Sequence, residues 1–409
     1  MTAPVTTPVK DTVTAPALRT ISALGVIEIF AWGSSFYLMA PLAGAIGAET
    51  GWSLGFLSGG VSLGLLVSGL SAPAVGRWIG RTGGRLTLST GMVCLALGLA
   101  LLGLAQSQTA FLLAWAVLGL GMACGLYDAA FSVLGSAYGR NARSAITQLT
   151  LWGGFASTVC WPLSAWMVEA IGWRGACFAY AALHLCLTFP LSRLLLPRTA
   201  GTPEAAQRAG TEGTAAPAPV SGRDLRVLCI VATGVTLSML ASIFSIHMVP
   251  LLGAQGYTMA AAIGLGTLLG PSQVAARVLE MLGRGRHHPI WTLSASAGCV
   301  LIGMGGLALG VPAAVAVVAW GAGNGLWSIC RGALPLAIFG AEGYAALMGR
   351  LARPMLIAGA VAPLIGAALI EGLGPERTLQ ALGLLALLPL CATALLFSRL
   401  EGAARRLPT

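Results

Sequence analysis

Charged side chains are scarce in this sequence. Only 9% of its 409 residues are charged and 56% are hydrophobic, whereas a soluble domain carries roughly 25% charged residues. The sequence also lacks a phosphate-binding G-x-x-x-x-G-K-[ST] loop, a nucleophile elbow and an H-E-x-x-H motif. These absences argue against a soluble domain, an ATP-driven machine and the common hydrolases. We therefore expect neither enzymatic activity nor a cofactor.

Cysteine and histidine form no recognisable metal motif. The nine cysteines are scattered, mostly inside apolar runs, with no C-x-x-C pair and no histidine at zinc spacing. The formal charge of +10 suggests nucleic acid at first sight, but the arginines alternate along the chain with the hydrophobic segments. We expect no metal ion and no nucleic-acid partner, and the positive charge is interpreted as orienting the chain in a membrane.

Long hydrophobic runs make up nearly the whole chain. A helix needs about 20 apolar residues to cross the hydrocarbon core of a bilayer, and the 56 glycines suit close packing between membrane helices. The fold expected is an all-α membrane protein with twelve transmembrane helices. The candidate spans are 18–46, 53–75, 86–105, 110–138, 145–168, 175–196, 225–251, 259–282, 290–309, 312–338, 352–371 and 378–398.

The positive residues predict which side of the membrane holds the termini. An even number of spans puts both termini on one side, and lysine and arginine accumulate on the cytoplasmic side. With cytoplasmic termini, all but four of the 23 lysines and arginines fall on that side or in its loops, the exceptions being Arg174, Arg277, Arg331 and Arg377. The predicted location is the bacterial inner (plasma) membrane, with multiple crossings and both termini cytoplasmic.

A polar segment and a weak internal repeat divide the chain into two halves. Residues 199–222 are small, polar and proline-bearing, which is typical of a flexible linker. At a shift of about 200 residues, Gly125-Leu126-Tyr127 matches Gly325-Leu326-Trp327 and Arg77 matches Arg277. Parallel repeats of this kind place a solute site between the halves. The expected division is a cytoplasmic tail 1–17, a six-helix bundle 18–198, a cytoplasmic linker 199–224, a six-helix bundle 225–398 and a cytoplasmic tail 399–409.

A glycine- and arginine-rich loop follows the second span. It reads Gly76-Arg77-Trp78-Ile79-Gly80-Arg81-Thr82-Gly83-Gly84-Arg85 and resembles the loop motif of the major facilitator superfamily, although Gly80 stands where the family has an acid. The resemblance implies two pseudo-symmetric six-helix bundles, secondary transport by alternating access, and arginines that hold the cytoplasmic side closed. The equivalent place in the second half carries Glu280. The expected gating residues are Gly76, Arg77, Arg81, Gly83, Arg85 and Glu280. The alternative is that these arginines are only positive-inside anchors.

Two short segments resemble one branch of that superfamily more weakly. Gly51-Trp52-Ser53 at the start of span two and Gln273 to Arg277 in span eight look like the monocarboxylate porters and oxalate/formate exchangers. In that branch the arginine meets the substrate carboxylate, and an acid four residues earlier takes part in proton coupling. Here Gln273 replaces the acid. The resemblance therefore implies an anion-binding role for Arg277 without the usual coupling group.

Charged residues inside apolar runs need a partner, a watery cavity or a function, because each costs about 2.5–3.5 kcal/mol at the bilayer centre on insertion scales. Glu28 lies in span one, Asp128 in span four and Arg331 in span ten. A guanidinium suits an anionic group, and a carboxyl group suits proton transfer. An Asp128–Arg331 salt bridge without substrate contact is the alternative left open. The expected substrate-binding residues are Arg331, Trp327, Asn324, Tyr127, Trp32 and Arg277, and the expected proton-coupling residues are Glu28, Asp128 and His247.

The function predicted from these features is secondary active transport of a small organic solute, a carboxylate-type anion, with proton coupling. Arg331, Arg277 and the branch resemblance favour it. Proton-driven efflux of an amphipathic or cationic compound is the alternative, because Glu28, Asp128 and Trp32 would suit a cation. The expected partners are a small-molecule substrate, a co-transported proton and the lipid bilayer, and the expected state is a monomer.

Overall fold

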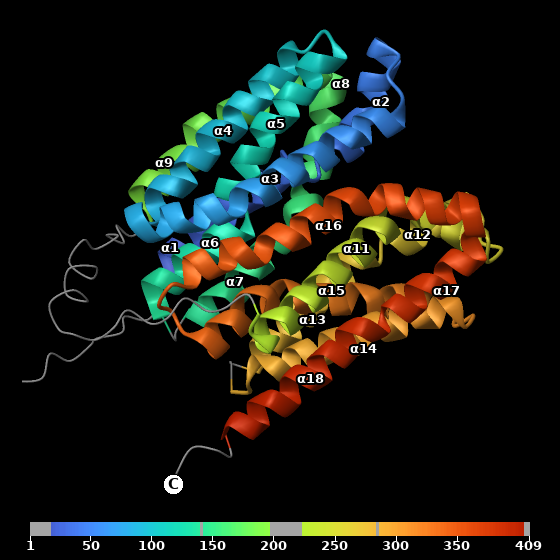
Figure 1. The fold of residues 1–409 in the computed structure, drawn as a ribbon. Coiled ribbons are helices and arrows are strands. Elements are labelled where there is room, and N and C mark those ends of the chain that lie inside the picture. Colours follow the sequence, from blue (N-terminus) through green and yellow to red (C-terminus); the bar gives the residue numbers. More distant parts are fainter. Residues whose placement is uncertain (1–17, 140–141, 197–222, 284–285, 405–409) are drawn as a thin grey trace, which may run out of the picture.

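The computed structural model describes residues 18–139, 142–196, 223–283 and 286–404. The expected N-terminal tail, most of the expected linker and Arg284 lie outside this part. All the regular structure within it is helical (Figure 1). The helices of the first half are α1 (Leu18–Gly33), α2 (Met39–Thr50), α3 (Leu54–Thr82), α4 (Gly84–Leu104), α5 (Gln108–Gly125), α6 (Tyr127–Tyr138), α7 (Ala142–Gly154), α8 (Ala156–Leu183), the π-helical turn η2 (His184–Thr188) and α9 (Phe189–Leu194). Those of the second half are α11 (Leu225–Gly253), α12 (Met259–Gly266), α13 (Leu269–Leu282), α14 (Pro289–Ala308), α15 (Ala313–Phe339), α16 (Tyr344–Leu373), α17 (Pro375–Leu385) and α18 (Leu387–Ala404).

These helices make twelve membrane crossings. Nine helical stretches of the described chain are long and apolar enough to span a membrane. One of them, Ala142–Leu194, crosses twice, because Gly172 at φ 74° turns the chain inside it. The first and eighth spans are each divided into two shorter helices, α1 with α2 and α12 with α13. The twelve-helix prediction is confirmed, as two pseudo-symmetric six-helix bundles.

Large apolar side chains cover the outside of the molecule. Leu104, Leu113 and Leu364 are 64%, 62% and 70% exposed, and many other leucines, isoleucines and valines of the long helices are also exposed. A water-soluble protein rarely exposes contiguous apolar surface on this scale. Lipid acyl chains are the solvent that such a surface fits, so the chain is a multi-pass membrane protein.

The two halves contact each other mainly at one end, which we call the linker end: the end at which α9 stops and α11 starts. The extensive contacts between halves are those of α3 and α6 with α16, of α7 with α13 and α15, and a smaller one between α6 and α15. Where a contacting span is divided into two helices, the helix that makes the contact is the one nearer the linker end. Figure 1 shows α16 lying along α3 where the two bundles meet. This structure is therefore closed at the linker end.

Glycines allow the closest approach between the halves. A Cβ atom on Gly76 of α3 would lie 2.4 Å from the carbonyl oxygen of Ala345, and one on Gly349 of α16 would lie 2.3 Å from the carbonyl oxygen of Ala72. No side chain fits at either position without moving a backbone. Small residues at such crossings let membrane helices pack backbone to backbone, and here they hold α3 against α16.

Several spans of the first half are interrupted, whereas most of their counterparts are continuous. Span one breaks after Gly33, span four at Leu126 and span five at Phe155, but α11, α15 and α16 run unbroken. Leu126 has an extended backbone (φ −95°, ψ −176°), while its repeat partner Leu326 lies inside α15. Irregular backbone at membrane depth is tolerated where it is buried in protein or lines a cavity. Spans one, four and five of the first half are therefore less regular than their counterparts in the second half.

Polar clusters fix the ends of several helices. At the end far from the linker, Glu49 accepts hydrogen bonds from the Trp173 indole (2.6 Å) and from Arg174 Nε (3.0 Å), and Arg174 Nη1 also donates to the carbonyls of Gly103 and Ala105. This cluster ties spans one, three and six together. Such tethers make the first half a coherent unit.

Candidate functional site

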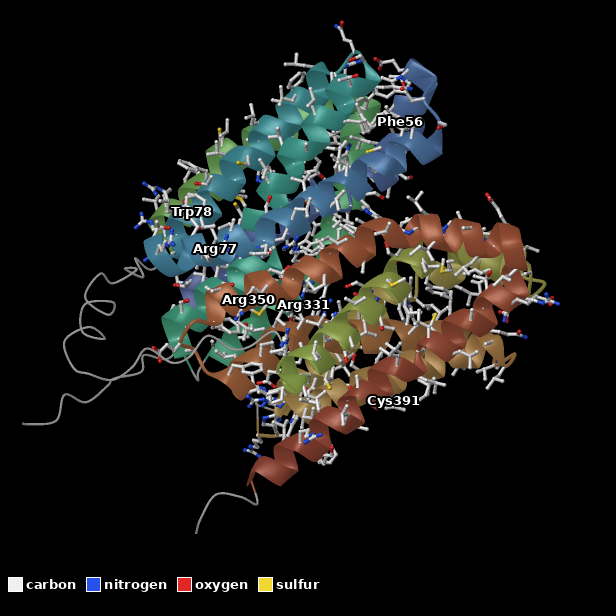
Figure 2. The ribbon with its side chains drawn as sticks, viewed as in Figure 1. Phe56, Arg77, Trp78, Arg331, Arg350 and Cys391 are labelled. Carbon is white, nitrogen blue, oxygen red and sulfur yellow. The ribbon has the colours of Figure 1, made fainter. Side chains whose placement is uncertain are left out.

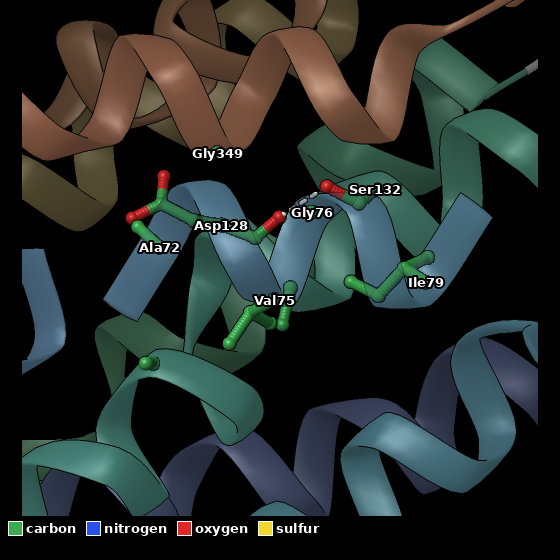
Figure 3. Close-up of a pocket in the computed structure, with 9 residues that line it drawn as sticks. Ala72, Val75, Gly76, Ile79, Asp128, Ser132 and Gly349 are labelled. Atoms are coloured by element: carbon green, nitrogen blue, oxygen red, sulfur yellow. Dashed lines mark hydrogen bonds between the residues drawn. The ribbon is translucent and has the colours of Figure 1, made fainter. Parts of the chain in front are cut away.

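The break in span four brings two side chains, those of Tyr127 and Asp128, to the interface between the halves. Because α5 ends at Gly125 and α6 starts at Tyr127, Asp128 occupies the first turn of α6. A carboxylate there is favoured by the positive end of the helix dipole. Ser132 donates a hydrogen bond of 2.7 Å to the main-chain carbonyl of Asp128, as Figure 3 shows. The break therefore creates a helix N-terminus at the depth where Asp128 lies.

Asp128 forms an ion pair across the two halves. Its Oδ1 accepts from Nη2 of Arg331 on α15 at 2.5 Å, and the two side chains are 18% and 16% exposed. The salt bridge that the sequence left open as an alternative is formed in this structure. Arg331 lies in the interior of the molecule (Figure 2), and its Nε finds no hydrogen-bond partner among the described residues. A guanidinium held this way is already neutralised by protein.

A small cavity lies beside Asp128 (Figure 3). Its volume is about 10 Å³, and Asp128, Ser132, Gly76 and Gly349 are among the residues that line it. A cavity of this size has room for about one water molecule. It places Asp128 next to the glycine crossing of α3 and α16, so the ion pair and the helix crossing share one environment.

Glu28 is the second acidic group at this depth. It lies on α1, is fully buried, and accepts a 3.0 Å hydrogen bond at Oε2 from the Trp32 indole one turn later. Its Oε1 has no hydrogen-bond partner in the described part of the chain. Trp32 packs on Tyr127 with ring centroids 5.1 Å apart. This contact connects Glu28 with the break in span four.

Arg277 is buried without a carboxylate. It lies on α13 and is 5% exposed. Its guanidinium donates to the carbonyl oxygens of Thr150 (3.0 Å) and Gly325 (3.4 Å) and to the side-chain oxygen of Gln273 (3.4 Å). No ion pair to Arg277 is formed within the described residues. Gln273 therefore supplies an amide where the resembling branch has an acid, and the positive charge of Arg277 stays uncompensated.

Tyr127 lies among these charged groups. Its hydroxyl donates to the same Thr150 carbonyl, at 3.3 Å, and it lies within electrostatic range of Arg277, Glu28 and Arg331. Phe131 stacks on its ring at 5.1 Å. Six of the residues expected from the sequence are thus brought together at the interface between the halves: Glu28, Trp32, Tyr127, Asp128, Arg277 and Arg331.

The other expected site residues lie differently. Trp327 is 6% exposed and packs in the apolar core, and Asn324, three residues earlier on the same face of α15, is half-buried. His247 bonds through Nε2 to the carbonyl of Pro363 at 3.0 Å, a contact between α11 and α16 inside the second half.

The loop motif after span two divides into packing and surface residues. Gly76 lies within α3 and makes the helix crossing already described, and Gly83 at φ 83° makes the turn into α4. Arg77 and Arg81 are exposed, and no ion pair is formed by either within the described chain. Figure 2 shows Arg77 at the end of α3 opposite Phe56. Arg85 is half-buried at the start of α4.

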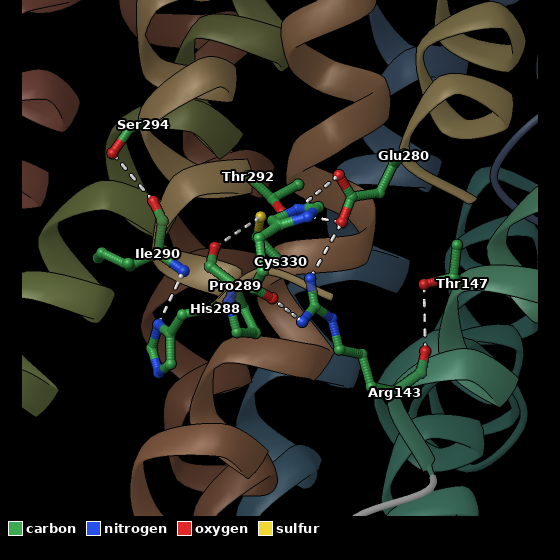
Figure 4. Close-up of polar contacts among 10 residues, drawn as sticks. Arg143, Thr147, Glu280, His288, Pro289, Ile290, Thr292, Ser294 and Cys330 are labelled. Atoms are coloured by element: carbon green, nitrogen blue, oxygen red, sulfur yellow. Dashed lines mark hydrogen bonds and ion pairs between the residues drawn. The ribbon is translucent and has the colours of Figure 1, made fainter. Parts of the chain in front are cut away.

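Glu280 is the centre of a polar cluster at the linker end (Figure 4). Its Oε1 accepts from Thr292 at 2.8 Å and from Arg143 Nη2 at 3.3 Å, and its Oε2 lies 3.2 Å from His287 Nε2. Arg143 also donates through Nη1 to the main-chain carbonyl of His287. Because Arg143 belongs to α7 and the others to the second half, this cluster joins the halves.

Sequence reasoning missed Arg143 and His287 as partners of Glu280. Both were visible only as positive or polar loop residues, and no spacing signal pairs positions 137 residues apart. A second missed group is His184, whose Nε2 lies 2.7 Å from Ser34 Oγ and whose Nδ1 lies 2.9 Å from Thr188 Oγ1. It links the break in span one to the π-helical turn η2, a feature common near functional sites.

The side chains of the described residues form no candidate metal site. Among the described residues no group of three or more His, Cys, Asp or Glu side chains gathers as metal ligands. All nine cysteines are free thiols. The chemistry that the arrangement offers is hydrogen bonding, ion pairing and proton transfer.

Comparison with known proteins identifies the architecture. A family model described as Major Facilitator Superfamily matches residues 24–352, and curated protein sequences give no significant match. The human organic anion transporter MFSD10 (TETRAN) has a TM-score of 0.73 at 13% identity, covering 93% of this chain and 100% of that chain. The transporter FucP of E. coli in its outward conformation has a TM-score of 0.70 at 14% identity, covering 92% of this chain and 98% of that chain. The proton:xylose symporter XylE has a TM-score of 0.66 at 14% identity, covering 93% of this chain and 94% of that chain.

Sequence identities this low show a shared fold and no more. The match to the family model is a separate observation, and it covers most of the chain, from the first span into the eleventh. It agrees with the twelve crossings, the two bundles and the interface between them. The chain therefore belongs to the major facilitator superfamily and is a membrane transporter, not an enzyme.

Proposed function

We propose that this protein is a proton-coupled secondary active transporter of a small carboxylate anion. The observation that carries the proposal is Arg277, a buried guanidinium whose only partners in the described chain are neutral oxygens. A guanidinium binds a carboxylate through two parallel hydrogen bonds, which are stronger than bonds to a carbonyl. Arg331 is occupied by Asp128, so we assign the anion to Arg277.

The charges at the interface support coupling to a proton. Asp128 and Arg331 neutralise each other, which leaves Glu28 and Arg277 as the groups without an oppositely charged partner. When Glu28 carries a proton, the net charge of the four groups is that of Arg277, and one carboxylate restores neutrality. When Glu28 is ionised, the same anion adds an unbalanced negative charge in a low-dielectric site. Proton and anion should therefore bind cooperatively.

The remaining site residues receive supporting roles in this proposal. Trp32 and Tyr127 form the wall between Glu28 and Arg277. Trp327 and Asn324 on α15, with Arg331, form the opposing wall, and His247 is a secondary proton group inside the second half. The gate comprises the α3–α16 crossing at Gly76 and Gly83, the surface arginines Arg77, Arg81 and Arg85, and Glu280.

The orientation belongs to the same proposal. The positive-inside rule assigns the linker end to the cytoplasm of a bacterium, with the domain boundaries expected from the sequence and a monomer as the working unit. The closed linker end then makes this an outward-facing state. Similar solved structures include an organic anion transporter and proton-coupled sugar symporters, so the fold accommodates either class of solute.

One observation favours a second candidate, efflux of amphipathic cations. Glu28 keeps an unpartnered carboxylate oxygen next to a row of aromatic rings: Trp32 contacts Phe36 and Tyr37, and Tyr37 contacts Trp161. Aromatic faces attract cations. Arg277 opposes this candidate, because it adds a buried positive charge beside the same rings.

Uptake into proteoliposomes tests the proposal. Labelled acetate, lactate, benzoate and tetraphenylphosphonium are each offered with and without an imposed pH gradient. We expect carboxylate accumulation that follows the gradient, and its loss in Arg277→Gln. The matched control is Arg226→Gln, which removes a surface arginine paired with Asp224. Gradient-driven movement of the cation alone would refute the anion proposal and support the second candidate.

A further inference from the structure

The end of α7 offers an unusual acceptor at the interface between the halves. The Thr150 carbonyl oxygen accepts two hydrogen bonds, from the Tyr127 hydroxyl at 3.3 Å and from Arg277 Nη1 at 3.0 Å. Tyr127 belongs to the first half and Arg277 to the second. Both donors lie within hydrogen-bonding distance of this one oxygen, so Thr150 becomes a point at which the second half is tied to the first.

Two glycines make this contact possible. A Cβ atom on Gly153 would lie 2.0 Å from the Tyr127 hydroxyl oxygen, and one on Gly154 would lie 2.4 Å from Arg277 Nη1. Any larger residue at either position collides with the side chain that reaches the carbonyl. Directly after them Phe155 interrupts the helix. The sequence Gly153-Gly154 thus opens the side of α7 to both donors.

A negatively charged ligand can take the place of the Thr150 carbonyl as a hydrogen-bond partner of Arg277. A carbonyl is a neutral acceptor, and hydrogen bonds in which both partners are ionised are shorter and stronger. The other partners of Arg277, the Gly325 carbonyl and the Gln273 amide, lie 3.4 Å away and belong to the second half. If a carboxylate takes Nη1, Arg277 therefore loses its tie to the first half and keeps its ties to its own half.

We propose that the Thr150 carbonyl is the internal ligand of Arg277 in the empty carrier, and that an anionic substrate must displace it. Gly153 and Gly154 act as positioning residues for this exchange. Binding of the anion thereby releases one tie between the halves, so that the loaded carrier is freer to open at the linker end. The release of the tie by an anion rests on the proposed function, whereas the tie itself does not.

The test replaces Gly154 with alanine. Its Cβ meets the far end of a flexible side chain, so Arg277 can swing away while the helix stays folded. The matched control is Gly270→Ala on α13, where no atom lies within 4 Å of the added Cβ. Hydrogen–deuterium exchange of the substrate-free protein is followed in α6, α7 and the start of α16. We expect faster exchange there in Gly154→Ala and wild-type rates in Gly270→Ala.

The second arm measures binding of acetate, lactate and benzoate. Without the competing carbonyl, Gly154→Ala should bind the transported carboxylate roughly tenfold tighter, equal to about 1.4 kcal/mol, and the same carboxylate should speed exchange in the wild-type protein. Arg277→Gln should show fast exchange and no binding. This contrast separates loss of the tie from loss of the anion receptor.

The outcomes distinguish the two proposals. Unchanged exchange in Gly154→Ala would overturn the tie at Thr150, whatever the transport assay shows. A second outcome would overturn displacement and leave the proposed function standing. In that outcome Gly154→Ala shows faster hydrogen–deuterium exchange and the wild-type protein transports carboxylates, but adding a carboxylate does not change the exchange rates of the wild-type protein. Failure of every carboxylate to bind or to be transported would overturn both the displacement and the proposed function.

Discussion

At the scale of single residues, chemical type does not decide role. Arg77 and Arg277 correspond under the internal repeat, yet Arg77 is exposed and Arg277 is 5% exposed. Arg331 differs again, because it is neutralised by Asp128. In our proposal the partner of each guanidinium decides its role: Arg77 is an anchor, Arg331 belongs to an ion pair, and Arg277 receives the anion. The two carboxyl groups differ in the same way: Glu28 has no cationic partner, whereas Asp128 is paired with Arg331.

Replacing Glu28 by glutamine should uncouple transport from the proton gradient. The amide keeps an acceptor for the Trp32 indole but carries no proton that titrates. We expect Glu28→Gln to retain carboxylate exchange between equal pools and to lose accumulation driven by a pH gradient. Counterflow and gradient-driven uptake are compared in the same vesicles, with the exposed Glu169→Gln as control. Normal accumulation in Glu28→Gln would rule out Glu28 as the proton carrier.

Replacing Asp128 by asparagine should leave Arg331 buried and unpaired. Removing one member of a buried ion pair costs about 3–5 kcal/mol, whereas removing both members costs much less. We expect a large loss of thermal stability in Asp128→Asn that the second change Arg331→Gln largely restores. Thermal unfolding of the two single variants and the double variant forms a double-mutant cycle. Additive losses would mean that the 2.5 Å contact contributes little.

At the scale of helices, interruptions and glycine contacts organise the interface. The breaks at Gly33, Leu126 and Phe155 present polar groups at membrane depth, and the α3–α16 crossing brings two backbones together without side chains between them. In the first half these helix ends shape the interface, whereas α11, α15 and α16 of the second half are continuous. Opening of the linker end must separate α3 from α16.

Adding one methyl group at the crossing should weaken closure. In Gly349→Ala the Cβ would lie 2.3 Å from the Ala72 carbonyl oxygen, a backbone atom that moves only if the helices separate. We expect a loss of about 1–3 kcal/mol, typical of overpacking. The control is Gly372→Ala in the same helix, which has no atom within 4 Å. Equal melting temperatures for the two variants would contradict the role of the crossing.

At the scale of the whole molecule, the halves are held together by groups of different strength. The glycine crossing, the Asp128–Arg331 pair and the tie at Thr150 lie deeper in the membrane, while the Glu280 cluster closes the linker end itself. The Glu280 cluster, like the Asp128–Arg331 pair, contains an ionised contact between the halves. We expect closure of the linker end to begin or end at this cluster.

Neutralising Glu280 should shift the carrier toward opening at the linker end. Glu280→Gln removes the charge that holds Arg143 of the first half (Figure 4), and a hydrogen bond between charged groups contributes about 1.5–3 kcal/mol. We expect at least a roughly tenfold change in the ratio of open to closed carriers. Spin labels at Thr82→Cys and Glu342→Cys, in a variant without native cysteines, report the distance between the halves.

The control for this experiment is Glu376→Gln, an exposed acid at the end far from the linker. It removes the same charge from the protein without touching the contacts of Arg143. A distance distribution in Glu280→Gln that matches the control would show that the polar cluster does not hold the linker end closed.

The sequence predicts the parts of this protein that depend on local composition. Apolar runs of sufficient length predict the twelve spans, and a charge inside a run marks Glu28, Asp128 and Arg331 as unusual. The breaks at Leu126 and Phe155 could not be foreseen, because no proline stands at either position and Leu326 in the same context is helical. Contacts such as Arg143 with Glu280 depend on how two bundles dock, which no local pattern encodes.

The solitary charge of Arg277 also constrains how the protein is made. An arginine inside a membrane helix costs up to about 2.5–3.5 kcal/mol on insertion scales, and Arg277 forms no ion pair within the described residues that would offset this cost. Helices enter the membrane in the order of synthesis, so the first half is already there when α13 leaves the ribosome. Its Thr150 carbonyl is the ready-made acceptor for the incoming arginine. We therefore expect the first half to serve as an assembly template for the second, so that the contact proposed to yield to an anion during transport also acts during biogenesis.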